Sequence, residues 1–251
     1  NYQMIGMLLG GIVWGILGDK RGRMTALFLT ILIYSLANIA NGFVQTVEQY
    51  KWLRFIAGFG LAGELGLGIT LVSETMSKEK RGYGTMIVAA VGLCGTVLAY
   101  FISEWGWRET YWLGGILGLL LLVLRIYIHE SGMFHQVKQQ QVARGNFLGI
   151  FINPKQLYKF LLCILVGLPV WFVIGILISY ANEFAVYMNV QGNIAPSKAV
   201  LVHYVGAAIG SIVTGVIGQM LHSRKKSLNI ALLTLLIFTI GYFYCFNVTA
   251  S

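Results

Sequence analysis

The chain has 251 residues, of which 57% are hydrophobic and 11% are charged, whereas an ordinary soluble domain carries about 25% charged residues. This composition excludes a typical soluble enzyme and predicts an integral membrane protein of the all-α class. The net charge of +9 does not indicate nucleic-acid binding, because the basic residues lie in short segments between apolar runs instead of gathering on one solvated face.

Eight apolar runs follow one another along the chain, each near the roughly 20 residues that a membrane-spanning helix needs. They cover residues 3–18, 24–43, 52–72, 83–103, 110–128, 158–187, 198–221 and 227–247. A backbone inside a bilayer must satisfy its own hydrogen bonds, so we expect each run to form a helix surrounded by lipid.

Basic residues divide unevenly when the segments between the runs are assigned alternately to two sides, with fourteen on one side and three on the other. The richer side carries Lys20, Arg21, Arg23, Lys78, Lys80, Arg81, Arg125, Lys138, Arg144, Lys155, Lys159, Arg224, Lys225 and Lys226. The poorer side carries Lys51, Arg108 and Lys198. By the positive-inside rule the richer side is predicted to be cytoplasmic, which describes a multi-pass protein of the plasma membrane, the inner membrane in a bacterium.

A short charged stretch, GDKRGRM at residues 18–24, separates the first two runs. Gly22 permits a tight turn, and Asp19 can accept hydrogen bonds from backbone amides or from an arginine. A cluster of opposite charges at such a seam can hold two helix bundles together in one conformation and release them in another. The alternative is that the basic residues only fix the topology, which leaves the acid at Asp19 without a reason.

The first and seventh runs repeat one pattern at an offset of 200 residues, and each copy leads into a basic segment. The matched positions are Gly6, Gly10, Ile12, Val13, Gly15 and Gly18 with Gly206, Gly210, Ile212, Val213, Gly215 and Gly218. The polar stretch between the copies predicts a cytoplasmic linker at 129–157, which joins an N-terminal bundle at 1–128 to a C-terminal bundle at 158–251. Two parallel six-helix repeats are a known transporter plan, and the offset predicts that this chain holds helices two to nine of twelve.

Three motifs in the chain resemble those of the major facilitator superfamily. The family's signature loop is matched by Gly15, Asp19, Lys20, Gly22 and Arg23. The chain departs from that motif at Met24, where the family usually has a second basic residue. RFIAGFG, which starts at Arg54, is similar to the family's fourth-helix pattern. SETMSKEKRG and HESGMF resemble the ends of the fourth and sixth helices in sugar-porter and metabolite:proton symporter relatives, although His129 and Gly132 stand where proline is frequent.

The resemblance covers essentially the whole chain and implies a fold of two six-helix bundles. It also implies a charged network at the cytoplasmic gate, formed by Asp19, Arg23, Glu74, Arg81 and Glu130. In the second copy of the repeat Gln219 replaces the acid, so we expect that copy to be the weaker latch.

Two ionisable residues lie inside predicted spans, Glu64 in GLAGELGLG and Arg54 ten residues before it. Such groups are costly in a bilayer and are functional candidates by default. Ten residues of helix measure about 15 Å, so the two need other partners. Glu64 is either a proton-coupling residue, as its resemblance to metabolite:proton symporters suggests, or a protonated or hydrogen-bonded packing residue. Arg54 either acts near the cavity and in proton coupling, as the family suggests, or snorkels to the outer interface.

Gly58, Gly60 and Gly63 spell G-x-G-x-x-G, a spacing that would indicate a dinucleotide site if it followed a strand. Here the glycines lie inside a predicted spanning helix. Small residues that allow close contact between helices therefore explain them better.

The run at 158–187 contains Pro169 and ends with polar residues, a combination that marks a possible broken helix lining a cavity. Trp171, Tyr180 and Asn182 are therefore the candidate substrate contacts. The alternative for the aromatic residues is a place in the belt at the membrane interface.

These features predict a secondary active transporter that moves a small polar or anionic solute by alternating access, coupled to protons as a symporter. We expect no enzyme activity, cofactor, metal or nucleic-acid partner. The expected partners are the solute, protons and the lipid bilayer, with the protein itself a monomer. The alternatives are an uncoupled facilitator or exporter of the same fold, and a membrane sensor that transports nothing.

Overall fold

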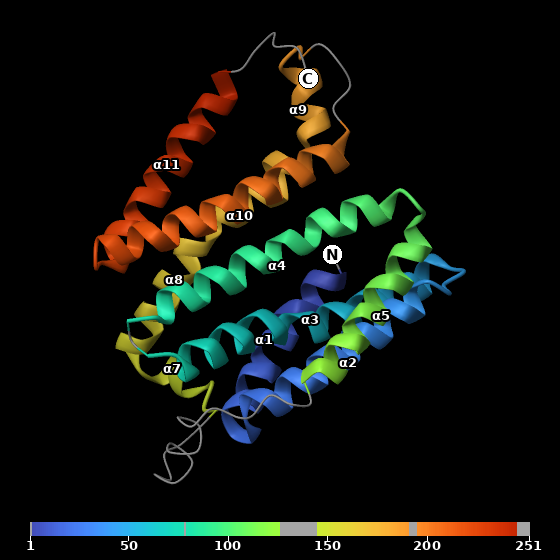
Figure 1. Cartoon of the computed structure of the whole chain (residues 1–251), viewed down its shortest axis with the longest axis horizontal. Coiled ribbons are helices and arrows are strands. Elements are labelled where there is room, and N and C mark those ends of the chain that lie inside the picture. Colours follow the sequence, from blue (N-terminus) through green and yellow to red (C-terminus); the bar gives the residue numbers. More distant parts are fainter. Residues whose placement is uncertain (1, 78, 126–144, 191–194, 245–251) are drawn as a thin grey trace. The chain divides into compact units, whose positions relative to one another are not determined.

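The structure is a computed structural model of the whole chain, and it describes residues 2–77, 79–125, 145–190 and 195–244. Its long helices are α1 (Tyr2–Arg21), α2 (Arg23–Asn41), α3 (Val47–Thr75), α4 (Arg81–Ser103), α5 (Trp107–Arg125), α8 (Pro154–Phe172), α10 (Pro196–Met220) and α11 (Arg224–Tyr244). Shorter elements are α7 (Gly149–Ile152), the π-helix η1 (Val173–Ile178) and α9 (Ala181–Tyr187). Figure 1 shows the order of these elements along the chain.

The eight predicted spans are confirmed as helices that are long and apolar enough to cross a membrane, with η1 extending the sixth to Pro154–Ile178. Their bounds differ from the predicted runs by a few residues. The sixth span ends nine residues before its predicted end at 187, and among the starts the largest difference is at α3, which has 29 residues and begins at Val47. A capping box explains this early start, because the Thr46 hydroxyl accepts from the Gln49 amide while the Gln49 side chain accepts from the Thr46 amide.

Contacts group the chain into two compact units. Unit 1 comprises Asn1–Gly84 and Phe101–Ile152, and unit 2 comprises Thr85–Tyr100 and Asn153–Ser251. Most of α4 thus groups with unit 2. The predicted division into bundles at 1–128 and 158–251 stays a prediction, because most of the 129–157 linker lies outside the described residues.

In unit 1, α3 packs against both α1 and α2, and α2 also packs against α5 (Figure 1). The centre of the contact between α1 and α3 is Trp14, which is buried with Ala26, Leu27 and Leu67. Its indole Nε1 donates to the Phe59 carbonyl at 2.7 Å, so the polar edge of a buried aromatic ring is satisfied by the neighbouring backbone.

Glycines bring the helices of unit 1 together. A Cβ atom on Gly10 would overlap the backbone of Phe59, and one on Gly60 would lie 2.7 Å from the Tyr34 backbone nitrogen. A Cβ on Gly63 would lie 2.8 Å from the Trp14 ring. The prediction that the G-x-G-x-x-G spacing in α3 serves close helix contact is therefore confirmed.

The 200-residue repeat has a structural counterpart at its helix ends. α1 ends at Arg21 and α10 at Met220, while α2 begins at Arg23 and α11 at Arg224. The residues in the two turns, Gly22 and His222, both have positive φ, at 108° and 47°. The surroundings of the two copies differ, because no atom of the described chain beyond the local helix lies within 4 Å of a Cβ placed on Gly206 or Gly210.

The sixth span is broken, as its proline and polar residues predict. α8 contains Pro169 in its last turn and passes into the π-helix η1, where the Ser179 hydroxyl donates to the Ile174 carbonyl at 2.7 Å. The chain leaves helical geometry at Tyr180 and resumes it in α9. Proline removes one backbone donor and crowds the preceding turn, so Pro169 weakens the end of α8 just before the π-helix begins.

Candidate functional site

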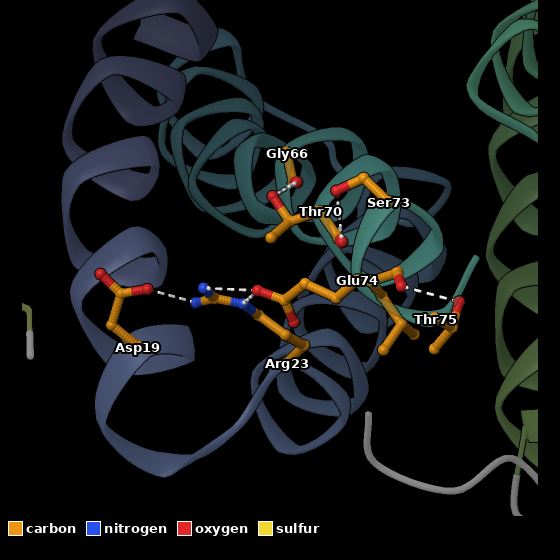
Figure 2. A network of polar contacts seen from close by, with 8 residues as sticks. Asp19, Arg23, Gly66, Thr70, Ser73, Glu74 and Thr75 are labelled. Atoms are coloured by element: carbon orange, nitrogen blue, oxygen red, sulfur yellow. Dashed lines mark hydrogen bonds and ion pairs between the residues drawn. The ribbon is translucent and has the colours of Figure 1, made fainter. Parts of the chain in front are cut away.

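An arginine held by two acids joins the ends of α1, α2 and α3. We call Asp19, Arg23 and Glu74 the Arg23 cluster. Asp19 lies near the end of α1, Arg23 is the first residue of α2, and Glu74 lies in the last turn of α3. Gly22 places α2 directly after α1, which brings Arg23 one helical turn from Asp19. Figure 2 shows the guanidinium lying between the two carboxylates.

The hydrogen bonds of the Arg23 cluster fix its geometry. Arg23 Nη2 and Nε donate to Glu74 Oε1 at 3.2 and 3.4 Å, and Nη1 donates to Asp19 Oδ1. The side chains of Arg23 and Glu74 are 15% and 17% exposed, whereas that of Asp19 is 42% exposed. The Arg23–Glu74 pair is therefore the better shielded half of the cluster, and water and salt weaken the Asp19 half.

In the last turns of α3, hydroxyl side chains near Glu74 form hydrogen bonds to backbone carbonyls of the same helix. Thr70 donates to the Gly66 carbonyl and Ser73 donates to the Thr70 carbonyl, each at 2.8 Å (Figure 2). These bonds satisfy the hydroxyls within the helix itself. They leave the Glu74 side chain directed at Arg23.

Two further residues of the expected gate network are Arg81 and Glu130. Arg81 begins α4, and its Nε donates to the Met76 carbonyl at 3.1 Å, which caps the end of α3 next to Glu74. Glu130 lies outside the described residues, as do His129 and Gly132. The structure thus brings Asp19, Arg23 and Glu74 together and places Arg81 beside them.

A second cluster lies about ten residues before Glu74 on α3. It consists of Tyr34, Glu64 and Arg125, and we call it the Glu64 cluster. Glu64 Oε1 lies 3.7 Å from Arg125 Nη2, which is within ion-pair distance, and the phenol of Tyr34 lies beside the same carboxylate. The side chains of Glu64 and Arg125 are 25% and 22% exposed. Three helices, α2, α3 and α5, each contribute one member.

Arg54 lies at the opposite end of α3 from the Arg23 cluster. Its Nη2 donates to the Gln3 side-chain oxygen on α1, and its guanidinium carbon lies 5.5 Å from the centre of the Tyr111 ring on α5. The Tyr111 hydroxyl in turn lies 2.9 Å from that of Tyr50. Arg54 therefore contacts two neighbouring helices through an amide oxygen and an aromatic ring.

The three expected substrate contacts lie on separate parts of the broken span. Trp171 is near the end of α8, Tyr180 lies between η1 and α9, and Asn182 is in the first turn of α9. The side chains of Trp171 and Tyr180 are exposed. No hydrogen bond or ring contact in the described part of the chain joins the three to one another, and their role stays a prediction.

Sequence reasoning missed the partners of Glu64. From the sequence, Arg125 counts only as a topological charge and Tyr34 only as part of an apolar run. A signal was available for Arg125, because it lies inside the apolar run 110–128, where a cation needs a compensating group. No comparable signal marks Tyr34, since finding it requires knowing which face of α2 meets α3.

The sequence profile of the Major Facilitator Superfamily matches residues 2–251. The chain is 35% identical over 132 residues to the niacin transporter NiaP of Acinetobacter baylyi, covering 51% of this chain and 30% of that protein. It is 25% identical over 244 residues to the sialic acid transporter NanX of Escherichia coli, covering 94% of this chain and 58% of that protein. The chain thus spans less than two thirds of the length of these relatives.

A solved structure shares the fold. The proton:xylose symporter XylE bound to 6-bromo-6-deoxy-D-glucose superposes with a TM-score of 0.62 at 18% identity, covering 87% of this chain and 57% of that one. The eight helices and these bacterial relatives describe a multi-pass membrane protein.

Proposed function

Because the chain belongs to the Major Facilitator Superfamily, we propose that the protein is a secondary active transporter. It moves a small polar or anionic solute across the bacterial inner membrane by alternating access and couples that movement to protons as a symporter. The observation that carries the coupling is Glu64, a carboxyl group inside a helix long enough to span the membrane, held against a cation from another helix.

The family supports transport rather than enzyme activity, since the relatives compared above are named as transporters. The names niacin and sialic acid fit the proposed class of small polar solute. Under this proposal the Arg23 cluster lies at the cytoplasmic end and holds the gate in one conformation. Trp171, Tyr180 and Asn182 contribute to the solute site in the second half.

Arg54 fits a role in the same process. It has an amide oxygen and an aromatic ring as neighbours, and both are favourable contacts for a guanidinium. A cation of this kind inside a span can attract the carboxylate of an anionic solute or take part in proton coupling.

The experiment begins with the full-length protein purified and screened against small metabolites by thermal shift, since a ligand that binds the folded state raises the unfolding temperature. The hits are then tested for uptake into proteoliposomes under an imposed proton gradient. A symporter accumulates the solute, and a protonophore abolishes the accumulation. Movement that ignores the gradient indicates a facilitator or exporter, and a folded protein that neither binds nor moves any solute indicates a sensor.

Glu64→Gln tests the coupling residue. We expect solute exchange between the two sides to continue while gradient-driven accumulation falls to the level set by equilibration, because glutamine cannot release a proton. Glu48→Gln is the matched control, since Glu48 lies on the same helix with an exposed side chain. Unchanged accumulation in E64Q would refute the assignment of Glu64.

A further inference from the structure

We infer that Arg125 is the positioning residue for Glu64, holding its carboxylate as the anion of an ion pair so that a proton and Arg125 compete for the same group. The inference rests on the proposed function, in which Glu64 takes up and releases the coupled proton. It adds two residues to that function, Arg125 as the competitor and Tyr34 as the neutral neighbour.

The guanidinium of Arg125 lies within ion-pair distance of the Glu64 carboxylate. Arg125 Nη2 lies 3.7 Å from Glu64 Oε1, and each side chain is about three quarters shielded by the protein. An arginine stays positively charged under all conditions relevant here. In the paired state Glu64 is therefore an ionised carboxylate with its counter-charge in place, and once it is protonated Arg125 has lost the anion that compensates it.

Each helix that packs against α3 supplies its own neighbours. α2 contributes Tyr34, whose phenol lies beside the carboxylate, and α5 contributes Arg125. α1 meets α3 through Trp14 and a face of glycines. The Arg23 cluster is too far away to act as a direct neighbour of Glu64. Its member on α3, Glu74, is ten residues from Glu64, which is about 15 Å along the helix, and Glu74 is paired with Arg23.

Arg125 belongs to α5, a helix that packs on α2. α3 and α5 both pack on α2, and the Glu64–Arg125 pair links them across it. Protonation of Glu64 removes that link, so α5 is the element that responds to the proton.

The test compares two transport modes in the full-length protein, gradient-driven accumulation and solute exchange, for R125Q, R125K, E64Q and E64Q/R125Q. We expect R125Q to lose accumulation and keep exchange, as E64Q does, because Glu64 without its competitor does not release the proton. R125K, which keeps a cation, restores part of the accumulation. Arg108→Gln is the matched control on α5 and is expected to leave both modes unchanged.

The double variant decides whether the two residues act as a unit. If each single change lowers accumulation about tenfold, independent residues give about a hundredfold loss together, whereas a competing pair gives a loss close to that of E64Q alone. Loss of both modes in R125Q, with normal purification and thermal stability, would show a merely structural role and overturn the inference. If E64Q accumulates solute normally, the proposed coupling itself fails, whatever Arg125 does.

Discussion

Replacing Arg23 with glutamine should release the end of the bundle at which α1, α2 and α3 meet. The change removes the cation that lies between two carboxylates and leaves the largely buried Glu74 without its partner. If the cluster holds one conformation of a transporter together, the loss favours the conformation in which this end is open.

The size of the effect follows from the exposure of the two acids. Hydrogen bonds to charged groups contribute about 1.5–3 kcal/mol when shielded, and Glu74 is only 17% exposed. A pair with a solvated group contributes about 0.2–1 kcal/mol, and Asp19 is 42% exposed. We therefore expect R23Q to destabilise the conformation that the cluster holds together by about 2–3 kcal/mol relative to the open one. Because each 1.4 kcal/mol changes an equilibrium constant tenfold, this shifts the conformational equilibrium by about 30- to 150-fold. E74Q should approach this value, and D19N should remain well below it.

The assay is single-molecule energy transfer between two dyes placed across this end of the full-length protein in nanodiscs. All native cysteines of the full-length protein, Cys94, Cys163 and Cys245 among them, are first replaced so that only the dye sites react. Lys51→Gln is the control, since Lys51 forms an exposed ion pair with Glu48 at the other end of α3. An unchanged distribution in R23Q, or an effect of D19N as large as that of E74Q, would refute the reasoning.

Two further predictions concern the contact between α1 and α3. Gly10→Ala should lower the free energy of unfolding by about 1–3 kcal/mol in thermal or denaturant unfolding, because the added methyl group meets the Phe59 backbone. Gly11→Ala on the same helix is the control: the space around Gly11 is open, so this change should alter the stability by less than about 1 kcal/mol. Trp14→Phe should cost about 1 kcal/mol through the lost hydrogen bond to the Phe59 carbonyl, in addition to any loss of packing. Equal stability of the two glycine variants, or an unchanged midpoint in W14F, would contradict this account of the contact.

The helices could be predicted from the sequence because the bilayer leaves the backbone few choices. A run of about 20 apolar residues must satisfy its own hydrogen bonds, and in the described part of the chain each of the eight runs contains a helix long enough to cross a membrane. The turn at Gly22 and the break after Pro169 were predictable for similar local reasons. The start of α3 at Val47 was missed, since a polar capping box extended the helix beyond its apolar part.

The partners of the charged residues were only partly predictable. Asp19 and Arg23 are four residues apart across a single turn, so their contact follows from local geometry, and the resemblance added Glu74. The pairing of Glu64 with Arg125 joins residues 61 positions apart and depends on how α3 and α5 are rotated about their axes. Hydrophobic patterning determines that rotation weakly in a membrane, because lipid and protein interior are both apolar.

One face of α2 relates the two clusters. Arg23 and Tyr34 are eleven residues apart, and at 3.6 residues per turn this is close to three full turns, so both point to the same side of the helix. That side meets α3, where Arg23 contacts Glu74 and Tyr34 lies beside Glu64. A rotation or shift of α2 against α3 therefore changes both contacts at once. If Glu64 binds the coupled proton and the Arg23 cluster acts as the gate, then α2 contacts both sites. A movement of α2 alone can then couple proton binding to the gate.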